Sequence, residues 1–178
     1  MPLRLCKLLL TASLAAFAFI GAYDNVVDYD SNYEFVRHVL SMDTTFPTNT
    51  LRTRAITSPA LWNAAHIATI TTEALTALAF ARGAYDLLRN LRAPAQRFQA
   101  ARRYTIIGAI LAFRFWFTGF MVIGGAYFSM WQSATWNGQQ AAFRFDVTVL
   151  LVLIVLLQPD QDLEPPARPS TATTEPHN

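Results

Sequence analysis

The apolar residues of this chain are gathered into four blocks, each close to the length that a helix needs to cross a membrane. The blocks cover about residues 5–23, 60–81, 104–127 and 141–157. Since an α-helix rises about 1.5 Å per residue, roughly 20 apolar residues cross the ~30 Å of hydrocarbon in a bilayer. The pattern therefore predicts an all-α protein, a four-helix transmembrane bundle formed by residues 1–158.

The composition agrees with a membrane protein and argues against two other classes. Of the 178 residues, 53% are hydrophobic, and the net charge is only +2. The basic residues do not alternate with stacking aromatics on a polar surface, so we expect no nucleic-acid partner. The single cysteine, Cys6, excludes an intrachain disulfide and any multi-cysteine metal site.

The first apolar block has a second interpretation, a cleaved signal peptide. Arg4 and Lys7 precede or open it, and small residues lie around Ala16 and Ala18, which are features of such peptides. The apolar run continues through Ile20, which is longer than the usual apolar core of a signal peptide. The length favours a spanning helix.

The loop charges predict the orientation of the spans. Residues 82–103 are rich in arginine and contain Asp86 as their one acidic residue. Because Lys and Arg resist translocation, this loop should be cytoplasmic. Both termini are then cytoplasmic as well, and loops 24–59 and 128–140 face outward.

The tail, residues 159–178, is rich in Pro, Thr and acidic residues and nearly free of aliphatic ones. Such a segment cannot bury enough apolar surface to offset the entropy of ordering it. We therefore expect a disordered cytoplasmic tail.

The first outer loop should contain a short amphipathic helix. Ser31 and Glu34 have the spacing of a capping box that opens a helix. The apolar residues that follow fall on one helical face: Phe35, Val36, Val39 and Leu40. We expect this helix to lie on the outer membrane surface, and its alternatives are a helix that caps the bundle or one that docks on a partner.

Three tryptophans map to the outward ends of the spans or to the outer loops. They are Trp62, Trp131 and Trp136. An indole can keep its ring in the membrane interface and its N–H in water. We expect these residues to anchor the protein at the interface.

Two ionisable residues interrupt the second and third blocks, namely Glu73 and Arg114. A charge at membrane depth costs a few kcal/mol, so both should face protein or water. Counted from the cytoplasmic ends at about 1.5 Å per residue, they lie at similar depths. We expect an intramembrane ion pair, which could be a structural latch, a proton or ion relay, or a contact with a partner subunit.

A second polar group lies nearer the outer face. His66 is a few residues inside the second block, and Arg144 and Asp146 are similarly placed in the fourth. We expect these three residues to form an outer polar cluster. The polar stripe from His66 to Thr76 either lines a hydrated cleft or hydrogen-bonds across the buried side of the bundle.

Several long strings of this sequence resemble a known family. They are NVVDYDSNYEFVRHVLSMDTTF from Asn25, RAITSPALWNAAH from Arg54, EALTAL from Glu73 and GFMVIGGAYFSMWQSATWNGQQAAFRF from Gly119. They resemble a bacterial family of predicted small integral membrane proteins, catalogued as a domain of unknown function, from the first span to about Pro159. The resemblance implies a multi-pass protein of the bacterial inner membrane with four spans, and it implies no activity, cofactor or catalytic residue.

The sequence contains no motif that indicates an enzyme. It has no Gly-rich phosphate loop, zinc-ligand spacing or nucleophile elbow. Only His66 among the histidines lies in a spanning block, which argues against haem held by two histidines. We therefore expect no catalytic residue, cofactor or metal. The expected function is an accessory or scaffold subunit, which engages a membrane-protein partner or a second copy; the alternative is a small oligomeric transporter or channel with a polar path through Glu73, Arg114 and His66.

Overall fold

The computed structural model describes residues 1–163, and residues 164–178 lie outside the described part. Four stretches are long and apolar enough to cross a membrane: Pro2–Val27, Pro59–Arg89, Ala95–Tyr127 and Gln139–Leu157. Each contains one of the four apolar blocks of the sequence. The prediction of an all-α bundle with four membrane helices is confirmed.

The elements follow one another along the chain as helices and short helical turns. They are α1 (Pro2–Val27), α2 (Tyr29–Ser41), the 3-10 helix η1 (Thr50–Arg54), α3 (Pro59–Arg89), α4 (Ala95–Ala100), α5 (Arg103–Phe113), the π-helix η2 (Arg114–Tyr127), the 3-10 helix η3 (Met130–Gln132) and α6 (Gln139–Leu157).

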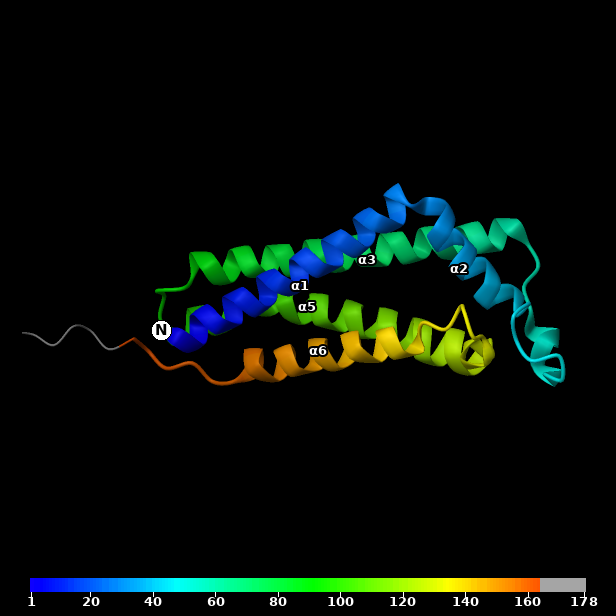
Figure 1. Ribbon diagram of the computed structural model, residues 1–178. Helices are drawn as coiled ribbons and strands as arrows, with labels where there is room; N and C mark the ends of the chain where they lie inside the picture. The colour runs from blue at the N-terminus through cyan, green and yellow to red at the C-terminus, as the bar shows by residue number, and fades with distance from the viewer. Residues whose placement is uncertain (164–178) are drawn as a thin grey trace, which may run out of the picture.

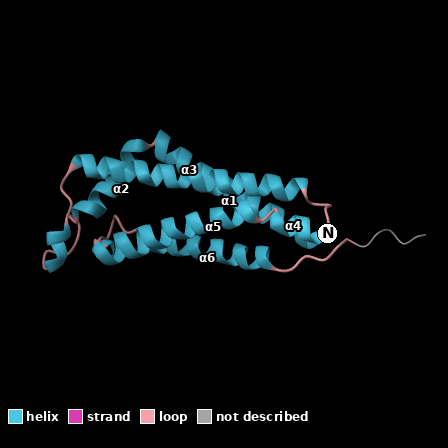
Figure 2. Cartoon of the chain, turned by 180° about the vertical axis from the view of Figure 1, so that it is seen from behind, coloured by secondary structure: helices cyan, strands magenta, loops and turns pink. Residues whose placement is uncertain are grey.

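The long helices form two layers. Figure 1 shows α1 crossing α3 in one layer and α5, continued by η2, beside α6 in the other. The amino terminus and the chain that leaves α6 lie at one end of the bundle, together with α4, and α2 lies at the other end (Figure 2). We call these the N-terminal end and the α2 end. Which side of a membrane each end faces is still a prediction.

The N-terminal half of the bundle is filled with side chains. Leu14, Phe80 and Ala112 belong to one buried cluster, and Leu87 and Phe98 belong to a second cluster nearer the end. Small residues permit close contact of α3 and α5. A Cβ atom on Gly83 would lie 2.6 Å from the backbone nitrogen of Thr105, so only glycine fits this crossing.

Two basic residues of α1 are buried at the N-terminal end. Lys7 forms an ion pair with Asp160, and Arg4 donates hydrogen bonds to the carbonyl oxygens of Leu91 and Ala93, at 3.1 and 2.6 Å. Residues 159–163, the start of the predicted disordered tail, thus pack against the bundle. The remainder of that predicted tail lies outside the described residues.

The third span is not a uniform α-helix. From Arg114 it continues as a π-helix, in which the amide of Phe128 closes the last turn on the carbonyl oxygen of Ile123 at 2.9 Å. A π-helix is wider than an α-helix, and short π segments are frequent at functional sites. Gly119 lies inside it, and a Cβ atom built there would have no neighbour within 4 Å.

The segment in which the sequence predicts a short amphipathic helix contains α2, which starts earlier than the capping-box spacing predicts. Its N-cap is Asp28, which makes no side-chain capping bond, because α2 follows almost directly from the end of α1. Val39 of α2 is buried against Met42, Phe128 and Met130. This packing favours the alternative in which the helix caps the bundle.

Candidate functional site

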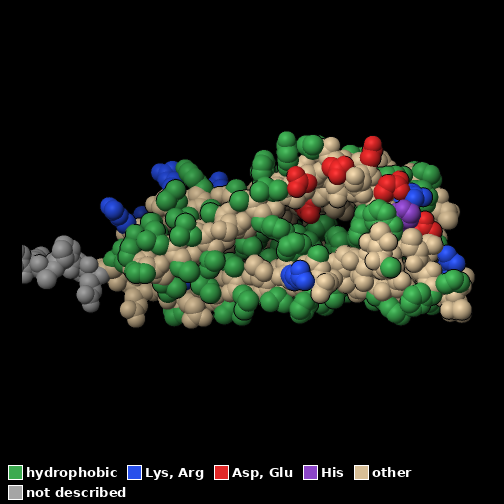
Figure 3. All heavy atoms as spheres, in the orientation of Figure 1, with side chains coloured by type: hydrophobic (Ala, Val, Ile, Leu, Met, Phe, Trp, Pro, Cys, Tyr) green, Lys and Arg blue, Asp and Glu red, His purple; other side chains and the backbone are tan. Residues whose placement is uncertain are grey.

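A cavity of about 840 Å³ lies in the α2 half of the bundle, between the two layers. Residues from α1, α2, α3, η2 and α6 line it. Figure 3 shows the molecule hollowed here, beneath acidic side chains at the corner where α1 meets α2. The walls are largely apolar and include Phe35, Phe115, Trp116, Phe120 and Phe145.

Glu73 lines the cavity from the middle of α3 and is buried. Its Oε2 atom accepts a hydrogen bond of 2.7 Å from the side-chain nitrogen of Asn25 in α1. That nitrogen also donates to the carbonyl oxygen of Gly21 at 3.0 Å, which fixes the amide against α1. Asn25 thus positions the carboxylate. Asn25 follows the first apolar block, so its position in the sequence does not indicate a role inside the bundle.

Arg114 also lines the cavity, but its side chain is exposed and pairs with no carboxylate in the described part of the chain. No nitrogen of Arg114 lies within 4.0 Å of a Glu73 carboxylate oxygen, so the expected ion pair is not formed. Equal depth alone does not bring two residues together, because the direction in which each faces around its helix also matters. Glu73 is held toward α1 by Asn25, away from a direct contact with η2.

His66 lines the cavity two helical turns from Glu73 and is completely buried. Its ring packs edge-on against Tyr29, with ring centroids 4.5 Å apart, and more distantly against Tyr33. Neither ring nitrogen has a hydrogen-bond partner within 3.5 Å among the described residues, although the backbone of Asn25 lies near the ring. A buried polar group without a partner costs free energy, so these nitrogens mark a place where a ligand group or water would stabilise the fold.

The other two members of the expected outer cluster do not join His66 in the cavity lining. Asp146 is buried, and neither of its carboxylate oxygens has a hydrogen-bond partner within residues 1–163. Arg144 is exposed. Two residues of an α-helix that are two positions apart face roughly opposite sides, which agrees with the burial of Asp146 and the exposure of Arg144. A cluster of all three residues stays a prediction.

The three tryptophans lie at the α2 end, but they differ in exposure. Trp62 is half-buried and donates a hydrogen bond of 2.7 Å to the carbonyl oxygen of Ile56. Trp131 is exposed and packs edge-on against Phe46. Trp136 stacks on His38 at 4.6 Å. Their role as interface anchors stays a prediction, and the exposed ring of Trp131 fits that role best.

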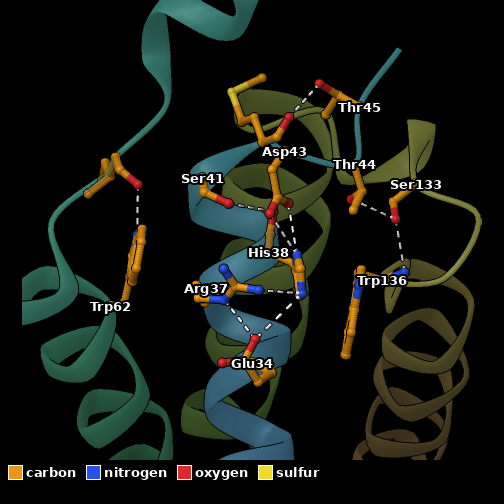
Figure 4. A network of polar contacts seen from close by, with 12 residues as sticks. Glu34, Arg37, His38, Ser41, Asp43, Thr44, Thr45, Trp62, Ser133 and Trp136 are labelled. Carbon is orange, nitrogen blue, oxygen red and sulfur yellow. Dashed lines mark hydrogen bonds and ion pairs between the residues drawn. The ribbon is translucent and has the colours of Figure 1, made fainter. Parts of the chain in front are cut away.

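The two loops at the α2 end, residues 42–58 and 128–138, are joined by polar contacts above the cavity. The His38 ring nitrogen Nδ1 lies 2.8 Å from Asp43, and Arg37 pairs with Glu34 (Figure 4). Across to the second loop, the Thr44 hydroxyl donates to Ser133 at 2.9 Å. This network holds α2 and its following loop over the α2 end.

A second set of contacts involves Gln132. Its side-chain oxygen accepts hydrogen bonds of 3.0 Å from the Phe46 amide and from the Asn49 side chain. Arg54 donates to the carbonyl oxygen of Tyr127 at 3.1 Å and covers the tyrosine ring. The loops therefore form a folded cap above the cavity.

The lining of the cavity resembles that of a small-molecule pocket in composition. Apolar and aromatic walls with a few polar groups are the usual composition of pockets for small molecules. Within residues 1–163, no group of three His, Cys, Asp or Glu side chains is placed to hold a metal ion.

The four long apolar helices, with a cavity between them, define a multi-pass integral membrane protein. Residues 3–159 match the family described as predicted small integral membrane protein (DUF2165), and the chain belongs to this family. The resemblance noted in the sequence is thereby confirmed. No curated protein and no solved structure matches the chain.

Proposed function

We propose that this protein is an accessory or scaffold subunit of a membrane complex, with a partner covering the surface around Arg114. The observation that carries this proposal is the exposure of Arg114 on the single chain, within a spanning helix. An arginine at the centre of a spanning helix costs at least about 2.5 kcal/mol on insertion scales. A partner that offers an acceptor to the guanidinium would remove much of this cost.

The packing of the bundle supports this function over a small oligomeric transporter or channel. Glu73, Arg114 and His66 line one cavity, but the cavity lining does not extend below Glu73 in α3 or Leu111 in α5. The N-terminal half beneath it is filled by buried apolar side chains such as Phe80. A polar path across the single chain therefore has little support.

We place the protein in a bacterial inner membrane, with both termini cytoplasmic and the α2 end facing outward. The arginine-rich residues 82–103 support this orientation, since they lie at the same end as the amino terminus. The folded cap formed by the two outer loops would then face the aqueous side, where its charged residues are solvated.

Extraction of the tagged protein from its native membrane with a polymer or mild detergent tests the proposed function. We expect a larger membrane protein to remain bound in a fixed ratio to the wild-type chain, and to be lost in Arg114→Leu. The matched control is Arg92→Leu, an exposed arginine in the loop after α3. Recovery of a homo-oligomer alone, or equal partner retention by both variants, would contradict the accessory-subunit function.

A further inference from the structure

The cavity has polar groups at two depths along α3. Glu73 lies fourteen residues from Pro59, the first residue of α3, which is roughly 21 Å along the helix axis. Glu73 is therefore near the middle of the span. His66 lies seven residues nearer the α2 end, so about 10 Å separates the two residues along the axis. A ligand that used both groups would reach from the α2 half to the centre of the membrane.

The depth of these groups limits the charge of the ligand. A phospholipid head group would have to leave the interface and enter the hydrocarbon region to approach Glu73, and the cost of burying its charges is high. An uncharged head with hydrogen-bonding atoms avoids that cost. The unpartnered nitrogens of His66 can serve as a donor or an acceptor for such a head.

The walls between these polar groups favour a flat ligand. Phe115, Trp116, Phe120 and Phe145 line the cavity, and aromatic side chains prefer offset or edge-on contacts with other rings. The cavity volume, about 840 Å³, lies within the usual range for pockets that hold drug-sized molecules. It is large enough for a substituted ring and the first part of an apolar tail.

We propose that the cavity binds an uncharged lipophilic molecule with a flat, hydrogen-bonding ring, the chemistry of an isoprenoid quinone. The ring lies between the aromatic walls, one of its oxygens pairs with His66, and the apolar tail passes into the lipid. The completely buried, unpartnered imidazole is the observation that distinguishes this cavity from a gap in the packing. The inference is independent of the accessory-subunit function, because it requires no partner.

Binding can be measured with the full chain in nanodiscs of neutral phospholipid, using ubiquinone-1 as the probe and tryptophan fluorescence as the signal. Trp116 lines the cavity, so a bound quinone should quench it in a saturable way. His66→Phe keeps a ring packed against Tyr29 and Tyr33 but removes both nitrogens. We expect it to bind the probe about tenfold more weakly, and to melt no lower than wild type without the probe.

A second variant and a control complete the test. Gly119→Phe places a ring where a Cβ atom has no neighbour within 4 Å, so it should fold and abolish saturable quenching. Thr71→Val changes an exposed residue of α3 outside the cavity lining and should bind as wild type. Unsaturable quenching that is equal in all variants would overturn the proposal. So would full recovery of the tryptophan fluorescence on adding oleate at a concentration below that of ubiquinone-1, since the cavity would then prefer an anionic lipid.

Discussion

The Nζ atom of Lys7 lies 2.8 Å from Oδ2 of Asp160, and both side chains are almost completely buried. Lys7 also donates a hydrogen bond of 2.5 Å to the carbonyl oxygen of Gln158, and the guanidinium of Arg4 donates to Gln161 at 2.9 Å. The Nε atom of Arg4 also lies 4.0 Å from Oδ1 of Asp160, so one carboxylate compensates two buried cations of α1. Through these bonds α1 holds residues 158–161, the segment that follows α6.

Replacement of Asp160 by Ala should destabilise the protein strongly, because it leaves Lys7 buried without its anion. Removing one partner of a buried ion pair typically costs about 3 to 5 kcal/mol. Denaturant titration in mixed micelles would measure the change in the free energy of unfolding. Asp162→Asn is the control, since Asp162 is exposed and an amide oxygen can still accept the hydrogen bond from the Ala95 amide. Equal stability of the two variants would contradict a structural ion pair.

Alanine should have opposite effects at two glycines of the bundle. At Gly83 the new Cβ atom would meet the backbone of Thr105, which cannot move without separating α3 from α5. We expect Gly83→Ala to cost about 1 to 3 kcal/mol, as overpacked cores do. At Gly119 the Cβ atom has open space, so Gly119→Ala should be neutral or stabilising by up to about 1 kcal/mol. Thermal melts of both variants compare the two sites directly.

Glu73 and Arg114 should be weakly coupled, because Glu73 bonds to Asn25 and no direct ion pair joins it to Arg114. A double-mutant cycle with Glu73→Gln and Arg114→Gln should give an interaction free energy below about 0.5 kcal/mol, as for independent sites. The matched cycle with Asn25→Ala and Glu73→Leu should give between about 0.5 and 3 kcal/mol, as for residues in contact. A larger interaction free energy for Glu73 with Arg114 than for Glu73 with Asn25 would instead support the ion pair expected from the sequence.

The cap should loosen when its link across the two outer loops is removed. The buried Ser133 hydroxyl accepts hydrogen bonds from Thr44 and from the Trp136 amide, both at 2.9 Å. Ser133→Ala leaves these donors without a partner, which typically costs about 1 to 3 kcal/mol. Amide hydrogen exchange should become faster in residues 42–58, whereas the exposed control Thr135→Ala should leave it unchanged. Unchanged exchange in Ser133→Ala would show that the cap does not depend on this link.

The spans could be predicted from the sequence because the requirement for about 20 apolar residues is a property of composition alone. The same reasoning predicted that Glu73 and Arg114 face protein or water, since a charge in a spanning helix avoids lipid. Both do line the cavity. These predictions needed only the length of the helix and the polarity of each residue.

The contacts of the site could not be predicted in the same way. Counting residues gives the depth of Arg114 in the membrane but not the side of the helix on which it lies. The change from α-helix to π-helix at Arg114 also alters the sides on which the later residues of the span lie. The burial of Arg4 and Lys7 depends on Asp160, which is distant in sequence and lies within a segment of polar composition. Such long-range partners are set by the packing of the helices.

Labelling of single cysteines should reveal the orientation of the bundle. In a Cys6→Ser background, Thr48→Cys places a thiol in the first outer loop, and Gln96→Cys places one in the arginine-rich loop; both positions are exposed. Because Lys and Arg resist translocation, a membrane-impermeant maleimide should label position 48 in intact spheroplasts and position 96 only after lysis. The opposite pattern would place the termini and the buried Lys7–Asp160 pair on the outer side, and the α2 half with its cavity on the cytoplasmic side.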